Sequence, residues 1–320
     1  MKNKICVVGS GNWGFNHVKT LAHLSSLGGV VEISQENKDR VKNLYPETPI
    51  FSSIEDSFEF KFDGYIIATP VVTHFEIAKK IINKGRHVLI EKPMTLNSSE
   101  AYELVELAKF KKVNAMVGHV LLFHPAIQKM KELIDSGKLG RLQYIYSNRL
   151  NLGKVRTEEN VFWSFAPHDI SILQYFTDSY PEDIQTTGGA FLQNGVYDTT
   201  ITTLSYPNNV KAHIYLSWLH PFKEHRIVVI GSEGMLSFED SMDSKPLKFY
   251  DKKYIIKDSI PEKHEGNVEL IDYPALAPLE EELRYFIDNM DLDKLGISNV
   301  ESGLDVIKIL ESASSNKIEV

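Results

Sequence analysis

The first 120 residues alternate between short apolar runs and segments in which apolar residues recur at helical spacing. An apolar run of four or five residues that ends at a glycine, such as residues 5–8, suits a strand buried on both faces of a parallel sheet. After Pro70, the residues Phe75, Ala78 and Ile81 fall on one side of a helix that Gly85 would end. Strands are expected at residues 5–8, 30–33, 64–69, 87–90 and 115–117. Strands and helices that alternate with short links predict an α/β fold with a doubly wound parallel sheet.

The pattern changes after about residue 120. From Val210 to Trp218 every second residue is apolar, as in a strand whose sheet is packed on one side only. Two further strands are expected around the turn at residues 231–234, and helices near residues 125–136, 279–289 and 301–313. We therefore predict two domains, residues 1–120 and residues 121–320, joined without a low-complexity linker.

Composition narrows the function classes. Among the 320 residues, 35 Lys and Arg stand against 43 Asp and Glu, a net charge of −8 that argues against binding to nucleic acid or to an anionic membrane. A single cysteine, Cys6, excludes an intramolecular disulfide and a multi-thiolate metal site, and is expected to be a small buried apolar residue. No apolar run approaches the ~18–20 residues of a membrane span, and the apolar start is too short for a signal peptide. A cytoplasmic protein is expected.

Residues 9–14 read Gly-Ser-Gly-Asn-Trp-Gly, which fits G-x-G-x-x-G between a predicted strand and a predicted helix. Glycines there permit a tight turn, a close approach of the backbone to a diphosphate and close helix–strand packing, and the helix N-terminus favours an anion. Glu32 follows Gly14 by eighteen residues, near the spacing of an acid that binds the adenosine ribose. A carboxylate there would repel a 2′-phosphate, which favours NAD over NADP. The alternative is a glycine turn with a structural role only. The expected cofactor contacts are Gly9, Gly11, Asn12, Trp13, Gly14 and Glu32.

Thr69 and Pro70 follow a predicted strand at the carboxyl edge of the sheet, where ligands of open α/β sheets bind. They are expected to contact the cofactor. His74, four residues after Pro70, would either contact the cofactor or pack locally at the start of its helix.

Glu91-Lys92-Pro93 follows the predicted strand at residues 87–90, again at the carboxyl edge. A lysine there can donate a hydrogen bond to a substrate oxygen and stabilise charge that develops as a hydride leaves. A solvated loop lysine is the alternative from composition alone. Glu91 and Lys92 are also expected at the cofactor.

Together, the glycine loop, Ala68-Thr69-Pro70 with His74, and Glu91-Lys92-Pro93 resemble the glucose-fructose oxidoreductase / inositol dehydrogenase / MocA family over nearly the whole chain. Residues 146–156 and 163–170 are similar to the WlbA-type enzymes of this family, which oxidise C3 of UDP-N-acetylglucosaminuronic acid with NAD for surface polysaccharides. The resemblance implies an N-terminal Rossmann domain and a C-terminal α/β domain with an open, largely antiparallel sheet. It also implies a homodimer or homotetramer formed through that sheet, and a cis bond before Pro93.

The resemblance further implies a catalytic histidine in the second domain, within an Asp-x-x-x-His pattern. His168 matches the histidine, whereas Ser164 stands at the aspartate position. Lys92 and His168 are therefore the expected catalytic residues, and either can be the proton acceptor. Asp169 would cap a helix that starts nearby or take part in the site.

Arg149, Asn151 and Arg156 form a polar, basic stretch in an acidic protein, and with Lys92 and His168 they are the expected substrate contacts. Guanidinium groups bind carboxylate and phosphate well, whereas Lys154 is expected in a solvated loop. The histidines at 119, 124, 220 and 225 lack acidic companions, so no metal is expected. The leading hypothesis is NAD-dependent oxidation of a nucleotide-linked sugar acid at C3. The alternatives are a 3-ketoreductase, a dehydrogenase of another sugar, and a non-catalytic NAD-binding regulator.

Overall fold

The computed structural model describes residues 3–153, 155, 159–292 and 295–315, which form two compact units. The first unit combines residues 1–123 with residues 276–308, and the second combines residues 124–275 with residues 309–320. The sequence predicted a single break near residue 120. Residues 276–308 differ from that prediction, because they belong to the first unit.

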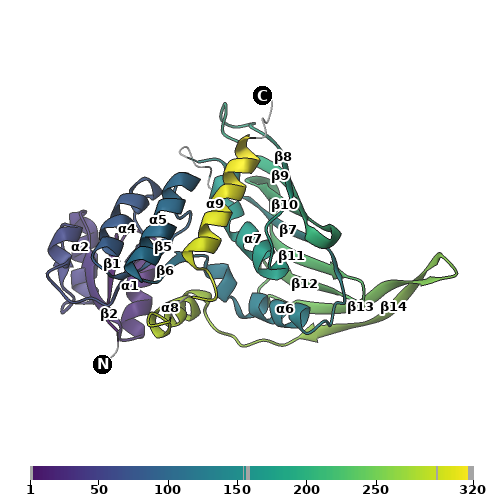
Figure 1. Cartoon of the computed structure of the whole chain (residues 1–320), viewed down its shortest axis with the longest axis horizontal. Coiled ribbons are helices and arrows are strands. Elements are labelled where there is room, and N and C mark those ends of the chain that lie inside the picture. Colours follow the sequence, from purple (N-terminus) through teal and green to yellow (C-terminus); the bar gives the residue numbers. More distant parts are fainter. Residues whose placement is uncertain (1–2, 154, 156–158, 293–294, 316–320) are drawn as a thin grey trace. The chain divides into compact units, whose positions relative to one another are not determined.

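The first unit is built on a six-stranded parallel sheet in the order β3-β2-β1-β4-β5-β6, which confirms the predicted doubly wound fold (Figure 1). Residues of β1 and β4 are almost completely buried, as expected for strands covered on both faces. The strands are β1 (Ile5–Val8), β2 (Leu27–Val31), β3 (Ile50–Phe51), β4 (Gly64–Ile67), β5 (His87–Glu91) and β6 (Ala115–Gly118).

Local sequence signals mark one end of α5 and one end of α4 in this unit. Asn97 accepts a hydrogen bond from the Glu100 amide and caps the start of α5. Gly85, with φ of 66°, follows the end of α4. The helices are α1 (Gly14–His23), α2 (Gln35–Leu44), α3 (Ile54–Ser57), α4 (His74–Asn83) and α5 (Ser98–Lys111), with short 3₁₀ turns η1 (Val71–Thr73) and η2 (Val120–Phe123).

Residues 276–308 attach to the first unit through α8 (Pro278–Asp288) and the start of α9 (Val300–Ser315). Leu283 and Phe286 of α8 are completely buried. The Asn114 amide donates hydrogen bonds to three backbone carbonyls at residues 289–292, and the Ser298 hydroxyl donates to the Val117 carbonyl at 2.6 Å. Helical periodicity predicted these helices but carries no information about which sheet they cover.

The second unit is built on an eight-stranded sheet in the order β14-β13-β12-β11-β7-β10-β9-β8. Every neighbouring pair is antiparallel except β7 with β10, which confirms the largely antiparallel sheet. The strands are β7 (Leu142–Leu152), β8 (Asp183–Gly189), β9 (Thr199–Tyr206), β10 (Val210–Ser217), β11 (Leu219–Gly231), β12 (Met235–Glu239), β13 (Leu247–Lys257) and β14 (Ile260–Ile271). Its helices are α6 (Pro125–Asp135), α7 (Val161–Thr177) and the 3₁₀ turn η3 (Pro207–Asn209).

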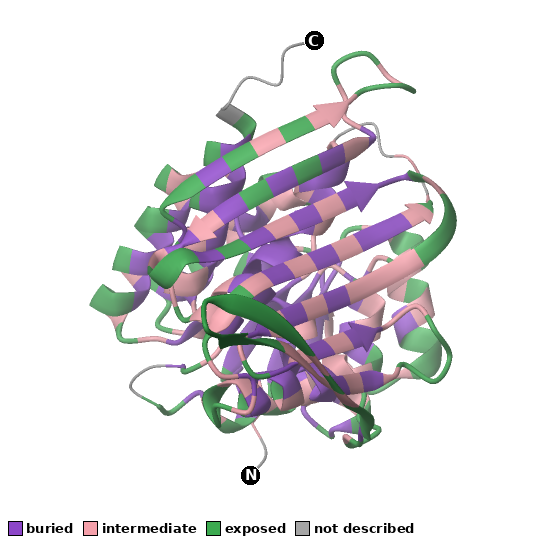
Figure 2. Ribbon diagram, turned by 90° about the vertical axis from the view of Figure 1, so that its right-hand side faces the viewer, coloured by how far each residue is buried: buried purple, intermediate pink, exposed green. Residues whose placement is uncertain are grey.

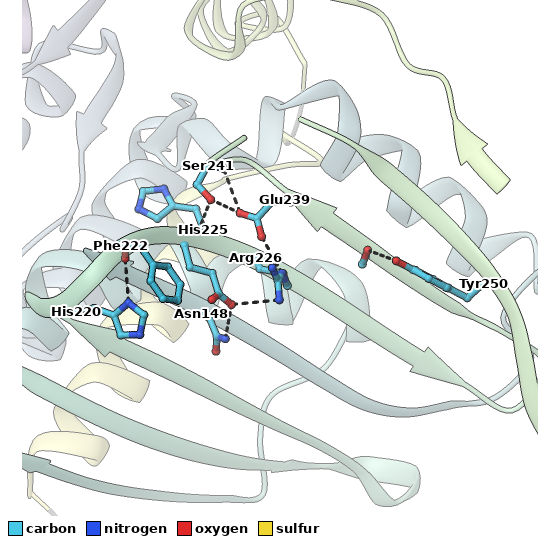
Figure 3. A network of polar contacts seen from close by, with 10 residues as sticks. Asn148, His220, Phe222, His225, Arg226, Glu239, Ser241 and Tyr250 are labelled. Carbon is cyan, nitrogen blue, oxygen red and sulfur yellow. Dashed lines mark hydrogen bonds and ion pairs between the residues drawn. The ribbon is translucent and has the colours of Figure 1, made fainter. Parts of the chain in front are cut away.

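Among the described residues, α7 covers one face of this sheet and no helix covers the other, which is called the open face (Figure 2). Ala212, Ile214 and Leu216 of β10 are buried, whereas Lys211 and Tyr215 between them are more exposed, so the predicted alternation is confirmed. Figure 2 shows the same alternation along the neighbouring strands. On the open face, Arg226 donates a hydrogen bond to Glu239 at 2.7 Å within a network of polar side chains (Figure 3). Within the described part of the chain, no helix combines the length and apolar character needed to cross a membrane.

Candidate active site

The glycine loop joins β1 to α1 and leaves open space above one of its glycines. The Gly9 amide donates to the Val31 carbonyl at 2.8 Å, and Gly9 has φ of 87°, a conformation that favours glycine. A Cβ atom on Gly14 would lie 2.0 Å from the Gly9 carbonyl oxygen, so the helix can approach the strand only without a side chain there. A Cβ atom on Gly11 would have no atom within 4 Å, so a diphosphate can come close to the backbone at this point.

The N-terminus of α1 points its amides toward this loop. Trp13 is the residue before the helix and makes no side-chain hydrogen bond that caps it. The positive end of the helix dipole is therefore available to an anionic group. Asn12 and Trp13 are both exposed at this end of the helix.

Glu32 directly follows β2 and ties the end of that strand to the glycine loop. One of its carboxylate oxygens accepts hydrogen bonds from the Ser10 amide at 2.7 Å and from the Ser10 hydroxyl at 2.9 Å. The other accepts from the amides of Ile33 and Ser34, both at 2.8 Å. Burial alone would raise the pKa of Glu32, but these hydrogen bonds outweigh burial and hold it below its ordinary value. Glu32 therefore presents a negative charge beside the loop.

Arg40, on α2, reaches the same loop and was missed by the sequence analysis. Its guanidinium donates hydrogen bonds to the carbonyls of Ser10 and Gly11 and lies over the Phe15 ring, 4.1 Å from the ring centroid. In sequence, an arginine in a strongly polar helix cannot be told from a solvent-exposed charge. Only the fold brings α2 to the loop.

Thr69 and Pro70 follow β4 at the carboxyl edge of the sheet, and His74 lies buried behind them. The Nε2 atom of His74 lies 2.9 Å from the Thr69 carbonyl oxygen, and its Nδ1 atom lies 3.0 Å from the Pro93 carbonyl oxygen. Burial lowers the pKa of His74, and the two carbonyls partly oppose this effect. Both ring nitrogens are engaged by backbone, which favours the local packing role that the sequence left open.

Glu91 is the last residue of β5, and its carboxylate joins three parts of the site. One oxygen accepts hydrogen bonds from the Trp13 indole at 2.5 Å and from His17 at 2.7 Å. The other accepts from the backbone amide of Lys92 at 3.1 Å. Burial alone would raise the pKa of Glu91, but His17, Trp13 and the charge of Lys92 outweigh it and hold the pKa low. The bond between Lys92 and Pro93 is cis, as the resemblance implies.

Two more buried ionisable groups, His119 and Glu282, lie near Glu91. His119, just after β6, has its pKa lowered to about 4 by burial, and its ring nitrogens have no hydrogen-bond partner among the described residues. Burial, together with the charge of Glu91, raises the pKa of Glu282 on α8 well above its ordinary value. The pKa values of these two neighbouring glutamates are therefore shifted in opposite directions, that of Glu91 downward and that of Glu282 upward. Among the described residues, no group of three or more His, Cys, Asp or Glu side chains is placed to hold a metal ion.

In the second unit, His168 lies in the middle of α7 rather than near its start. The helix begins at Val161, where the Asn160 side chain accepts a hydrogen bond from the Trp163 amide at 3.0 Å, and it continues through Pro167. The alternative of a capping role for Asp169 is therefore wrong, because the sequence placed the start of this helix too late. His168 is half-buried on the helix, and Ser164, at the position of the family's aspartate, is buried one turn before it.

Arg149 does not present its guanidinium to solvent. Its Nε atom donates to one carboxylate oxygen of Asp169 at 3.1 Å, and a terminal nitrogen donates to the other at 3.2 Å. The Ser147 hydroxyl also donates to Asp169, at 2.6 Å, and Asp169 is completely buried. This geometry favours a structural role for Arg149, which holds α7 against β7, over direct binding of a substrate anion.

The other expected substrate contacts lie at and beyond the end of β7. The amide oxygen of Asn151 is buried and has no hydrogen-bond partner among the described residues. Arg156 and Lys154 lie outside the described residues.

Comparisons with known proteins match both units. The model of an oxidoreductase family with an NAD-binding Rossmann fold, GFO/IDH/MocA, matches residues 3–119, and the model of the GFO/IDH/MocA C-terminal domain matches residues 127–237. A UDP-N-acetylglucosamine 3-dehydrogenase from Acidithiobacillus ferrooxidans is 32% identical over 187 residues, 58% of this chain and 57% of that protein. The match thus spans little more than half of that relative.

Two further comparisons cover a larger part of the chain. A scyllo-inositol 2-dehydrogenase (NAD(+)) from Bacillus subtilis is 26% identical over 248 residues, 73% of this chain and 72% of that protein. The solved structure of UDP-N-acetylglucosamine 3-dehydrogenase GnnA from Acidithiobacillus ferrooxidans superposes with a TM-score of 0.85 at 24% identity. That likeness covers 98% of this chain and 96% of the other, and it shows a common fold.

Proposed function

Because the chain belongs to the GFO/IDH/MocA family of oxidoreductases, with an NAD-binding Rossmann fold, we propose that it is an NAD-dependent sugar dehydrogenase. Its reaction is oxidation of the C3 hydroxyl of UDP-N-acetylglucosaminuronic acid to the 3-keto sugar, a step toward surface polysaccharide sugars. The observation that carries the proposal is that the Glu91 carboxylate accepts hydrogen bonds both from Trp13 and His17, at the helix of the glycine loop, and from the backbone amide of Lys92.

The described residues fit the cofactor at three points. The open space above Gly11 and the uncapped start of α1 suit a diphosphate. Glu32 suits the adenosine ribose of NAD, because a buried charged carboxylate would repel the 2′-phosphate of NADP. Asn12, Trp13, Thr69 and Pro70 lie at the same edge of the sheet and complete the proposed cofactor contacts.

We assign the oxygen and the proton of the reacting hydroxyl to two side chains. NAD, when bound, would supply the acceptor for the hydride that leaves C3. The Lys92 ammonium donates a hydrogen bond to the C3 oxygen and stabilises the negative charge that develops there. His168 accepts the hydroxyl proton, since an imidazole titrates near neutral pH. The buried pair of Arg149 and Asp169 holds the helix that carries His168.

The substrate class rests on similarity and on two residues that the sequence singles out, Asn151 and Arg156. A relative with 32% identity is named for oxidation at position 3 of a UDP-linked amino sugar. Asn151 provides an unpartnered acceptor, and we propose that Arg156 binds a substrate anion. A free cyclic polyol is the second candidate, since another relative is a scyllo-inositol dehydrogenase.

The test is the near-ultraviolet absorbance of reduced nicotinamide when NAD and a candidate sugar are added to the purified protein. The sugars are UDP-N-acetylglucosaminuronic acid, UDP-N-acetylglucosamine and scyllo-inositol, each with and without 2-oxoglutarate to reoxidise tightly held NADH. We expect an absorbance rise with the uronic acid and a product that mass spectrometry finds two hydrogens lighter.

Lys92→Ala should lower turnover by about 10³-fold while NAD still binds, because it removes the group that stabilises the developing charge. Lys109→Ala, at an exposed lysine of α5, is the matched control and should keep full turnover. An absorbance rise with another sugar would identify that sugar as the substrate. Reduction of a 3-keto sugar without any oxidation would indicate a ketoreductase. Binding of NAD without turnover of any sugar would indicate a regulator.

We also propose that the chain forms a homodimer or homotetramer through the open face of the eight-stranded sheet. Ile201, Tyr215 and Asn148 form one row across this face, and His213 stacks on Tyr146 in the next row. Ile201 is 44% exposed, and exposed apolar residues on a sheet face are typical of an interface. Light scattering should find a dimer or tetramer that Ile201→Asp dissociates, whereas a monomeric parent protein would contradict the proposal.

A further inference from the structure

Glu91 is almost completely buried, although it lies next to the proposed catalytic lysine. Its side chain occupies the space between the end of β5 and the first turns of α1, where Trp13 and His17 both donate hydrogen bonds to the same oxygen. The Nδ1 atom of His17 has no partner among the described residues, which fits the tautomer that donates from Nε2. The second Glu91 oxygen holds the Lys92 amide. One carboxylate therefore connects the helix of the glycine loop to the backbone of the lysine.

The surroundings leave this carboxylate little freedom. A Cβ atom on Gly118 of the neighbouring strand β6 would lie 2.9 Å from the Glu91 carboxyl group. The neighbouring ionisable groups come from five places in the unit: His17 from α1, His74 from α4, Lys92 from the residue after β5, His119 from the residue after β6 and Glu282 from α8. Of these groups, Lys92 is the only lysine, and Glu282 is the second glutamate.

We propose that Glu91 is a positioning residue, which holds the Lys92 backbone against the helix of the glycine loop and keeps a negative charge near the Lys92 ammonium. Two physical consequences follow. The lysine is kept in its charged form, because a nearby opposite charge stabilises the ammonium. Its backbone is also fixed relative to the loop that binds the diphosphate, and displacement of a reacting group by about 1 Å can cost about 10²-fold in rate. The inference rests on the proposed function, because it concerns how Lys92 is held for that reaction.

The experiment measures Lys92 directly, without cofactor or substrate. Trace acetylation with acetic anhydride over a series of pH values, followed by mass spectrometry of the Lys92 peptide, reports the fraction of neutral amine. In Glu91→Gln we expect the apparent pKa of Lys92 to fall by about one unit, because the neighbouring negative charge is lost. At a pH below that pKa, acetylation should therefore be about tenfold faster than in the parent protein.

Glu282→Gln is the matched control. Glu282 is also buried in the same unit, but its pKa is shifted upward, which favours its uncharged form, so its amide replacement should move the acetylation profile of Lys92 far less than Glu91→Gln does. Gly118→Ala is the second variant, since it keeps the carboxylate but pushes it from its place. It should move the profile in the same direction as Glu91→Gln and decides the question if Glu91→Gln does not fold.

Kinetics give a second readout that a purely structural role would not produce. In Glu91→Gln we expect kcat to fall about tenfold or more while the Kd for NAD changes by less than about threefold. A folded Glu91→Gln protein whose Lys92 acetylation profile equals that of the parent would overturn the inference. A shifted profile in a protein that oxidises no sugar would keep the positioning role and would instead overturn the proposed function.

Discussion

Replacement of Arg149 by methionine separates a structural role for this arginine from a role in substrate binding. The side chain of Asp169 is completely buried, and it takes two of its hydrogen bonds from Arg149 and a third from the Ser147 hydroxyl. Removal of one partner of a buried ion pair costs about 3–5 kcal/mol, because the remaining charge is left uncompensated. The Ser147 hydrogen bond survives in the variant, so we expect the lower end, about 3 kcal/mol.

The assay is urea denaturation of the variant, followed by tryptophan fluorescence and circular dichroism. A double variant, Arg149→Met with Asp169→Leu, removes both charges and should regain most of the lost free energy of unfolding, because a well-packed apolar pair replaces a buried ion pair at little cost. Arg226→Met is the matched control: Arg226 lies on the neighbouring strand β11 and pairs with Glu239, but its side chain is 43% exposed. Glu239 is buried, but it also accepts hydrogen bonds from Ser241, so the loss of the half-exposed Arg226 should cost less than the loss of Arg149.

Loss of this ion pair should also affect catalysis, because Asp169 lies next to His168 on α7. We expect Arg149→Met to lower kcat along with stability. If Arg149→Met proves as stable as Arg226→Met, and only the KM for the sugar rises, the structural assignment is wrong and Arg149 binds the substrate anion.

Three further predictions concern the first unit. Gly11→Ala should keep the parent Tm, since its Cβ atom meets only open space in the protein, but should weaken NAD binding by about tenfold in calorimetry. Gly14→Ala should instead lower the Tm, because its Cβ atom would lie 2.0 Å from the Gly9 oxygen. Glu32→Gln should raise the ratio of kcat/KM with NADP to that with NAD by at least about tenfold, and an unchanged ratio would remove Glu32 from the ribose. His119 has a pKa of about 4 in the folded protein, below the 6.5 of the unfolded chain, so the stability that it contributes is complete above pH 6.5 and is lost as the pH falls toward 4. This contribution is about 3 kcal/mol, and urea denaturation of His119→Leu should show a correspondingly weaker loss between these pH values.

The strands of the first unit could be predicted because a strand of a parallel sheet that is covered on both faces is an uninterrupted run of apolar residues. Residues 5–8 are all apolar since both faces of β1 are buried, and the structure places a strand at the same four residues. A cap acts over three residues and needs no tertiary information, so local sequence can also indicate the role of Asn97 at the start of α5.

The contacts that assemble the site could not be predicted from local pattern. Trp13 and Glu91 are 78 residues apart, and nothing near either residue indicates that an indole and a carboxylate meet. The start of α7 was also misplaced: a helix start was expected next to Asp169, whereas the helix begins at Val161 and continues through Pro167. Arg149 was expected to bind an anion of the substrate, because its sequence neighbours do not reveal that Asp169 lies against it.

The three motifs of the first unit make sense as one structure rather than as three separate signals. The residues on both sides of Lys92 are held in place. Glu91, which precedes it, accepts hydrogen bonds from Trp13 in the glycine loop and from His17 in α1. Pro93, which follows it, contacts His74 through its carbonyl oxygen. The other ring nitrogen of His74 contacts the Thr69 carbonyl, so the loop after β4 is joined to the same segment. A change in any one motif would therefore displace the lysine, even where the changed residue touches neither cofactor nor substrate. This mechanical dependence is a physical reason for G-x-G-x-x-G, Thr-Pro with a following histidine, and Glu-Lys-Pro to occur together in one chain.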